Sequence, residues 1–139
     1  MTRLLQFNPI ANTLKTIASP TRLAILLAIG DGEACVCHLE AILGKRQAYI
    51  SHHLMALRQA EMLLDRRDGR FVYYRIANPA LLDLVRDAER LAGVTLTPEG
   101  LASAREDCPC PQCAGAAAWL PLAEGVIRPN ASPSPTPLP

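Results

Sequence analysis

Apolar residues recur at helical spacing along most of the chain between residues 9 and 92, and one stretch shows the pattern most clearly. Ile50, Leu54 and Leu57 follow one another at intervals of four and three residues, which places them on one buried face of a helix over Gln47–Ala60. The opposite face of that helix carries polar side chains: Gln47, Ser51, His52, Arg58 and Gln59. The pattern therefore predicts an amphipathic helix whose outer face is free to contact water or a polar partner.

Further helices are indicated by capping residues and prolines. A side-chain cap followed by proline at the first helical position occurs three times, at Asn8-Pro9, Ser19-Pro20 and Asn78-Pro79. These pairs predict helices over about Pro9–Ala18, Pro20–Ile29 and Pro79–Ala92. A shorter helix is predicted over about Val36–Leu43, where Gly44 provides the stop.

The stretch after the amphipathic helix has the pattern of a β-hairpin. Asp68-Gly69 is a turn signal between two runs of strand-forming residues, about Leu63–Arg67 and Arg70–Ile76. Short helix, turn, second helix and hairpin occur in the order that a winged helix-turn-helix requires. We therefore expect a mainly α fold with a small β-hairpin wing, in which the second helix enters the major groove of DNA.

Charge supports this interpretation over that of an ordinary solvated surface helix. Between residues 45 and 75 the chain carries seven basic residues: Lys45, Arg46, Arg58, Arg66, Arg67, Arg70 and Arg75. Over the same window there are three acidic residues, Glu61, Asp65 and Asp68, so the local excess is four in a chain whose net charge is only +1. A basic patch confined to the predicted helix and wing favours binding to DNA phosphates.

Length and composition predict one main domain with a C-terminal extension. The chain has 139 residues, enough for a single hydrophobic core, which we assign to residues 1–95. Residues 96–127 form a cysteine-containing extension in which Thr97-Pro98-Glu99 caps a short helix to about Arg105, and the Pro/Ser-rich tail 128–139 is expected to be disordered. Because no apolar run approaches the ~18 residues of a membrane span and no signal peptide is evident, a cytoplasmic protein without a membrane partner is expected.

The five cysteines form two clusters, Cys35 and Cys37, then Cys108, Cys110 and Cys113. A single free cysteine is often an inert buried side chain, but thiolates at such close spacing typically capture thiophilic ions. In a regular helix Cys35 and Cys37 would point about 200° apart, so a shared ion requires an irregular or loosened first helical turn. An ion held there would be mechanically linked to the following DNA-reading helix.

Two wider expectations concern assembly and catalysis. The apolar stripe of Pro79–Ala92 is broad, and together with the first helix it offers a surface for a homodimer, the usual form of helix-turn-helix repressors. The sequence shows no nucleophile–base pair and no phosphate-binding loop, so we expect no enzyme activity.

Three motifs in this order resemble the ArsR/SmtB family of metal-sensing winged-helix repressors. The motifs are E-A-C-V-C-H-L, Q-A-Y-I-S-H-H-L-M-A-L-R-Q-A and L-L-D-R-R-D-G-R-F-V-Y-Y-R-I, and the resemblance covers about residues 8–92. It implies a dimer that binds operator double-stranded DNA in the apo form and is released when an inducer ion binds.

The first motif is similar to the arsenic-type site of that family, whose usual form is C-V-C-D-L-C. Cys35 and Cys37 match its first two cysteines, whereas His38 stands at the aspartate position and Glu40 at the third cysteine position. A third thiolate would come from Cys108, Cys110 or Cys113. Arsenite or antimonite is the first expectation for the inducer, with cadmium, lead or zinc next. His38 is a possible ligand, but we interpret it as a surface helix histidine.

The same resemblance implies DNA contacts from the helix and the wing. The residues concerned are Gln47, Tyr49, Ser51, His52 and His53 on the helix and Arg67 and Arg70 on the wing, with Lys45 and Arg46 just before the helix. Two alternatives remain open at this stage: a repressor that senses oxidants through cysteine disulfides, and a metal-free DNA-binding module with inert cysteines.

Overall fold

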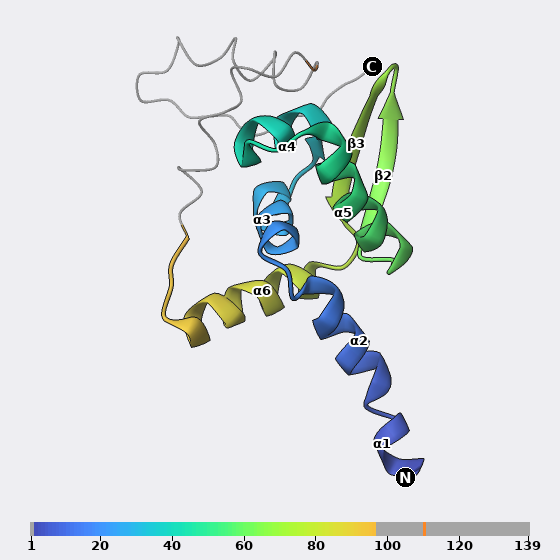
Figure 1. Ribbon diagram of the computed structural model, residues 1–139, viewed down its shortest axis with the longest axis vertical. Helices are drawn as coiled ribbons and strands as arrows, with labels where there is room; N and C mark the ends of the chain where they lie inside the picture. The colour runs from blue at the N-terminus through green and yellow to red at the C-terminus, as the bar shows by residue number, and fades with distance from the viewer. Residues whose placement is uncertain (1, 97–109, 111–139) are drawn as a thin grey trace.

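Figure 1 shows the computed structural model, which describes residues 2–96 and Cys110. In these residues six helices and three strands follow one another along the chain: α1 (Thr2–Leu5), α2 (Asn8–Ile17), α3 (Pro20–Ile29), β1 (Ala34–Cys35), α4 (Val36–Leu43), α5 (Gln47–Gln59), β2 (Leu63–Asp68), β3 (Phe71–Ile76) and α6 (Pro79–Ala92). The predicted mainly α architecture with a hairpin wing is confirmed.

The helix boundaries follow from caps that were visible in the sequence. The side-chain oxygen of Ser19 accepts a hydrogen bond from the Arg22 amide, and that of Asn78 accepts one from the Ala80 amide, so α3 and α6 begin as predicted. The predicted cap at Asn8 is wrong: α2 begins at Asn8 itself and Phe7 occupies the capping position. The reason is the preceding helical turn α1, whose Leu4 carbonyl accepts the Phe7 amide and leads the chain directly into α2.

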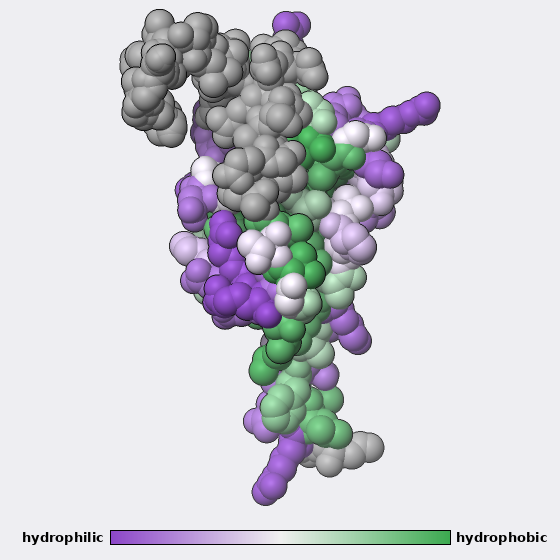
Figure 2. Space-filling model, turned by 90° about the vertical axis from the view of Figure 1, so that its left-hand side faces the viewer, coloured by the Kyte–Doolittle hydropathy of each residue, from purple (hydrophilic) through white to green (hydrophobic). Residues whose placement is uncertain are grey.

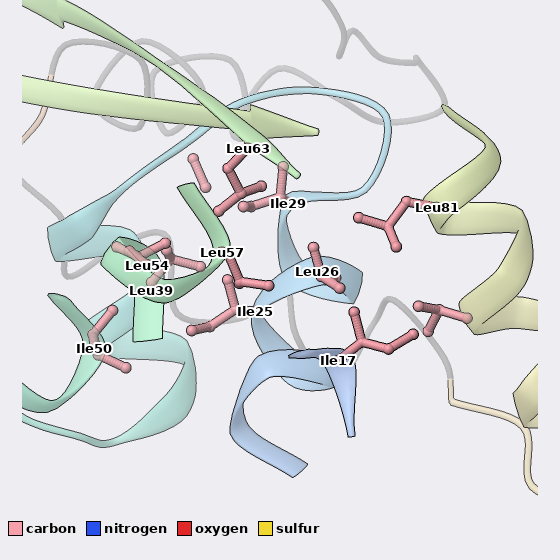
Figure 3. Packing of buried hydrophobic residues seen from close by; sticks show 12 residues of the cluster. Ile17, Ile25, Leu26, Ile29, Leu39, Ile50, Leu54, Leu57, Leu63 and Leu81 are labelled. Atoms are coloured by element: carbon pink, nitrogen blue, oxygen red, sulfur yellow. The ribbon is translucent and has the colours of Figure 1, made fainter. Parts of the chain in front are cut away.

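The hydrophobic core lies where α3, α4 and α5 meet the sheet and α6. Ile50, Leu54 and Leu57 of α5 are fully buried, which confirms the face predicted from their spacing. Figure 3 shows Leu57 beside Ile25 and Leu26, the two fully buried residues of α3. Because burial of each such side chain is worth about 1.5–3 kcal/mol, this contact fixes α5 against α3 and leaves its polar face outward.

The sheet contains one strand more than the sequence pattern predicted. Its order is β1-β3-β2, and the two-residue strand β1 pairs Cys35 with Tyr73 of β3. The hairpin itself runs with Asp68 opposite Phe71, so that its turn is Gly69-Arg70, with Gly69 in the left-handed region at a φ of 62°. β1 therefore joins the first cysteine cluster directly to the wing.

The N-terminal helices project away from the core (Figure 1). Figure 2 shows hydrophobic surface along this projection. The exposed large apolar side chains of this segment are Leu4, Leu5, Phe7, Ile10 and Leu14. In α6, Leu81, Leu82 and Val85 pack on the core, whereas Leu91 is exposed. Within residues 2–96, no helix combines the length and apolar character needed to cross a membrane.

Several predictions fall on residues that the structure does not describe. Apart from Leu96 and Cys110, the extension 96–127, with its short helix to about Arg105, lies outside the described residues. The same holds for the tail 128–139 and for Cys108 and Cys113.

Candidate functional site

Three of the five candidate thiols lie together. The sulfurs of Cys35, Cys37 and Cys110 are all within 4.8 Å of one another, and the Sγ atoms of Cys35 and Cys37 are 2.9 Å apart. Cys35 and Cys110 are buried, whereas Cys37 is half-buried. A residue from the second cysteine cluster thus completes a trio with the first cluster.

Cys35 and Cys37 meet because the first of them precedes α4 and does not belong to it. Cys35 has an extended backbone, with φ −86° and ψ 164°, and it is the N-cap of a helix whose first residue is Val36. Its sulfur accepts a hydrogen bond from the His38 amide over 3.3 Å. Cys35 thus lies just outside the regular helix, and this position provides the irregular first turn that a shared ion requires.

The wing forms one wall of the thiol cluster. Buried Tyr73 packs against Cys35 and Cys110, and Phe71 of the same strand packs at the edge of the cluster. The guanidinium of Arg66 lies over the Tyr73 ring, 4.7 Å from its centroid, and donates hydrogen bonds of 2.8 and 3.0 Å to the Glu33 carboxylate. The hydrogen bond to Glu33 raises the pKa of Arg66. The two charge-assisted hydrogen bonds hold the guanidinium in place beside the cluster.

His38 does not lie on the surface, which corrects the interpretation made from sequence. Its side chain is buried, because α4 packs against α3, α5 and β3 and turns this position inward. Among the described histidine, cysteine and acidic residues, the cluster with ligand atoms close enough for one ion contains the three cysteines and not His38.

The donor set fits a thiophilic ion. Two sulfurs bonded to one tetrahedral ion at about 2.3 Å lie roughly 3.8 Å apart, a distance between the 2.9 Å of Cys35–Cys37 and the 4.8 Å limit of the trio. Soft thiolates favour such ions over hard cations, which prefer oxygen. The three sulfurs therefore lie near the spacing that a shared ion requires, and the change that ion binding demands is a separation of the Cys35 and Cys37 sulfurs.

Most of the predicted DNA-facing residues of α5, of the turn before it and of the wing are exposed. Lys45, Arg46, Gln47, His52, Arg67 and Arg70 are exposed, and Ser51 is partly exposed. Two of the seven basic residues are taken up by ion pairs in the described chain, Arg58 with Asp65 and Arg66 with Glu33. The local positive charge is therefore concentrated at the start of α5 and along the hairpin.

Tyr49 and His53, also predicted to contact DNA, touch α3 as well. The Tyr49 hydroxyl lies 2.9 Å from the hydroxyl of Thr21, and Nδ1 of His53 accepts a hydrogen bond from Nε of Arg22 over 3.2 Å. Burial lowers the pKa of His53, and the charges of Arg22 and His52 lower it further. Sequence reasoning missed Arg22, because its role depends on a contact between two helices.

A helical core, a polar-faced helix preceded by a short helix and a two-stranded wing together define a winged helix-turn-helix protein. The model of the family described as "Bacterial regulatory protein, arsR family" matches residues 19–63. The biofilm growth-associated repressor of Agrobacterium fabrum is 36% identical over 90 residues, which cover 65% of this chain and 74% of that protein. The chain belongs to the ArsR family of bacterial regulatory proteins.

Other similar proteins carry names that refer to arsenic or antimony. The arsenical resistance operon repressor of Escherichia coli strain K12 is 45% identical over 64 residues, covering 45% of this chain and 55% of that one. The AntR antimony-specific transcriptional repressor is 29% identical, with a TM-score of 0.56 over 60% of this chain and 77% of that one. The chain spans about half to two thirds of the length of the first curated relatives it matches.

One solved structure bears on assembly. The homodimeric winged helix-turn-helix DNA-binding domain Mb0332 from Mycobacterium bovis superposes with a TM-score of 0.59 and is 27% identical. The match covers 68% of this chain and 88% of that one.

Proposed function

We propose that this chain is a metal(loid)-responsive transcriptional repressor. It binds operator DNA as a homodimer without ion and leaves the DNA when a thiophilic ion binds Cys35, Cys37 and Cys110. The observation that carries the proposal is the convergence of these three sulfurs, from clusters more than 70 residues apart in sequence, beside both the wing and the helix before α5.

DNA contact is proposed for the exposed polar residues of α5 and the hairpin. Gln47 suits a bidentate contact with adenine, and Ser51 and His52 lie on the same polar face. Lys45 and Arg46 before the helix and Arg67 and Arg70 in the wing suit phosphates or the minor groove. The exposure of these side chains and the basic charge around them support this assignment.

The choice of ion follows from the number and kind of donors. Three thiolates suit trivalent arsenic or antimony, which form pyramidal three-sulfur complexes, and the names of two similar repressors refer to these elements. Arsenite or antimonite is therefore the first candidate. Cadmium, lead and zinc also accept sulfur ligands and remain the next candidates.

Coupling between the site and DNA is proposed to pass through Cys35. This residue caps α4, pairs with Tyr73 in the sheet and supplies one sulfur of the trio. The sulfurs of Cys35 and Cys37 must separate from 2.9 Å to share an ion, and this moves the start of α4 relative to β1. Because α4 packs on α5, and β1 pairs with the wing strand β3, both DNA-reading elements are displaced.

The homodimer is supported by the apolar surface of the N-terminal helices. Phe7, the N-cap of α2, and Ile10 and Leu14 within this helix recur at helical spacing and are exposed. Leu91, Val94 and Leu96 at the end of α6 are exposed as well. A second copy that covers these side chains would remove an apolar surface from water and place two α5 helices on adjacent half-sites.

The proposal is tested by fluorescence anisotropy on a duplex that the wild-type protein enriches from a random-sequence library. Under full reduction, arsenite, antimonite, cadmium, lead and zinc are titrated separately into the preformed complex. Release by one of these ions at about one equivalent per protomer supports the proposal.

A thiol redox switch is the second candidate function, favoured by the 2.9 Å separation of the Cys35 and Cys37 sulfurs. In that case a peroxide oxidises one thiol to a sulfenic acid with loss of water, and the second thiol displaces a further water to form a disulfide. Release of DNA by peroxide and not by any ion, with recovery after addition of a thiol reductant, identifies this function instead.

A further inference from the structure

Four side chains join the beginning of α3 to the first turns of α5. Thr21 and Arg22 lie on α3, and Tyr49 and His53 lie one helical turn apart on α5; we refer to these four residues as the α3–α5 seam. The seam contains the 2.9 Å contact between the Thr21 and Tyr49 hydroxyls and the 3.2 Å hydrogen bond from Arg22 to His53. Tyr49 and His53 also meet edge to face, with ring centroids 4.8 Å apart.

Arg22 connects the seam to a third helix. While its Nε donates to His53, its terminal nitrogen Nη1 donates to the backbone carbonyl of Thr16 over 2.8 Å, near the end of α2. An uncapped carbonyl at a helix end favours a cation, so this contact has both hydrogen-bonding and dipolar character. One guanidinium therefore holds α2, α3 and α5 in fixed relation.

The hydrogen bond at Nδ1 places the remaining imidazole proton of neutral His53 on Nε2. Groups that face this ring are Arg22 from α3 and Tyr49 and His52 from α5 itself. A proton added at Nδ1 would turn this acceptor into a donor. It would also place the imidazolium of His53 and the guanidinium of Arg22, both positively charged, at hydrogen-bond distance. The link from Arg22 thus requires neutral His53.

We propose that Arg22 is a positioning residue for DNA recognition, which orients α5 through His53 and so fixes where Gln47, Ser51 and His52 meet the bases. This inference rests on the proposed DNA-binding function. It assigns to His53 a role inside the protein in place of the direct DNA contact implied by family resemblance. Tyr49, which is 44% exposed and joined to Thr21, contributes to the same orientation.

The test compares Arg22→Lys with variants that separate charge, hydrogen bonding and folding. Arg22→Lys keeps the positive charge but loses the planar pair of donors that reaches both His53 and Thr16. His53→Asn keeps an acceptor near the position of Nδ1, and Arg86→Lys, on the exposed side of α6, is the matched control. Thermal melts establish that each variant folds.

Two readouts are used. Nitrogen chemical shifts of the His53 ring report its tautomer without any DNA, and anisotropy reports binding to the enriched duplex and to a scrambled duplex. We expect Arg22→Lys to abolish the single His53 tautomer and to weaken binding to the enriched duplex about tenfold, as expected for one or two lost hydrogen bonds. Its affinity for scrambled DNA and its salt dependence stay at the wild-type values. Arg86→Lys binds both duplexes as the wild type does, and His53→Asn, which keeps an acceptor for Arg22, binds the enriched duplex more tightly than Arg22→Lys does.

An unchanged His53 tautomer in Arg22→Lys overturns the inference, even if the protein binds DNA. Equal weakening on both duplexes with a reduced salt slope also overturns it, since this result identifies Arg22 as a phosphate contact. A wild-type protein with the expected tautomer but no preference for any duplex contradicts the proposed function, and with it the role of Arg22 in recognition.

Discussion

At the scale of single residues, Cys35 combines three tasks that are usually separate. It supplies a buried thiol to the cluster, caps α4 through its sulfur and pairs with Tyr73 across the sheet. This position is thus attached both to helix α4 and, through β1, to the wing. In the proposed mechanism, a change at this sulfur therefore acts on the start of α4 and on the wing at once.

Cys110 is the residue through which the three-thiol site can be tested most simply. X-ray absorption of the protein with one equivalent of arsenite should show three sulfur neighbours for the wild type and two for Cys110→Ser, because Cys110 supplies the third sulfur of the trio. Cys113→Ser is the matched control from the same cluster and should keep three sulfur neighbours. Three sulfur neighbours in Cys110→Ser would show that another cysteine completes the site.

His53 predicts how stability changes with pH. Because its pKa is lowered in the folded protein below the ordinary value of 6.5, the unfolded chain binds more protons as the pH falls through this region. The free energy of unfolding should therefore fall as the pH drops below about 6.5 and should be insensitive to His53 at higher pH. Urea denaturation over a pH series measures this effect.

The control for this experiment separates His53 from other titrating groups. His53→Asn should flatten part of the dependence below about 6.5, whereas His52→Asn should flatten it less, because it keeps the partly buried His53 ring and removes only one of the charges that lower its pKa. Identical profiles for the wild type and His53→Asn would contradict the role assigned to the neutral ring.

At the scale of elements, the wing has two kinds of arginine. Arg66 is engaged with Glu33 and lies over Tyr73, whereas Arg70 is exposed at the turn, near Phe71. The first belongs to the wall of the thiol cluster and the second to the surface proposed to meet DNA. The hairpin thus joins the thiol cluster to the surface that we propose for DNA contact.

Arg70→Ala should weaken binding to every DNA sequence and lower the salt slope by about one, as expected when one phosphate contact is lost. Arg66→Ala is the control within the same hairpin, because its guanidinium is already held by Glu33, and it should leave the salt slope nearly unchanged. Anisotropy over a series of salt concentrations measures both. An Arg70→Ala variant with wild-type affinity and salt dependence would refute the proposed contact.

The elements were largely predictable from the sequence, and the exceptions have physical reasons. Ser19-Pro20, Asn78-Pro79 and Gly44 fix helix ends through local hydrogen bonds and backbone conformation, so short-range patterns suffice to locate them. β1 was not predicted, because a strand of two residues shows no alternation of polar and apolar positions and because it pairs with β3, which is distant in the sequence. The burial of His38 was not predicted, because it depends on how α4 packs against α3, α5 and β3.

The candidate site was predictable in its chemistry and not in its geometry. Cysteine spacing indicated a thiophilic ion and left the third ligand open among Cys108, Cys110 and Cys113. Only the folded chain brings Cys110 to Cys35 and Cys37, because that contact spans more than 70 residues. The Arg22–His53 hydrogen bond was not predictable from the sequence either, because its two residues lie on separate helices that meet only in the folded protein.

At the scale of the whole molecule, the described chain has a thiol cluster and an apolar projection at different places. The thiol cluster lies beside the wing, whereas α1 and α2 extend from the core with exposed apolar residues (Figure 1). In the proposed dimer this projection is covered by the partner. Both thiol sites then remain close to the DNA-reading elements of their own protomers.

Leu14→Glu should convert the proposed dimer to a monomer, because a carboxylate buried in an apolar interface without a partner is strongly unfavourable. The monomer should bind the enriched duplex much more weakly, since it contacts one half-site. Leu64→Glu is the control, because Leu64 has a similar exposure, 43% against 47%, but lies in the wing. Light scattering measures the mass, and a dimeric Leu14→Glu would contradict the proposed interface.

The central claim is that Cys35, Cys37 and Cys110 hold one ion whose binding releases DNA. Its most direct test is a titration of arsenite and, separately, antimonite into the reduced complex of protein and enriched duplex, followed by anisotropy. The account predicts that one of these two ions releases the wild-type protein completely at about one equivalent per protomer and leaves Cys110→Ser bound at the same concentration. A Cys110→Ser protein that is released as readily as the wild type, or a wild-type complex that neither ion disturbs, would contradict it.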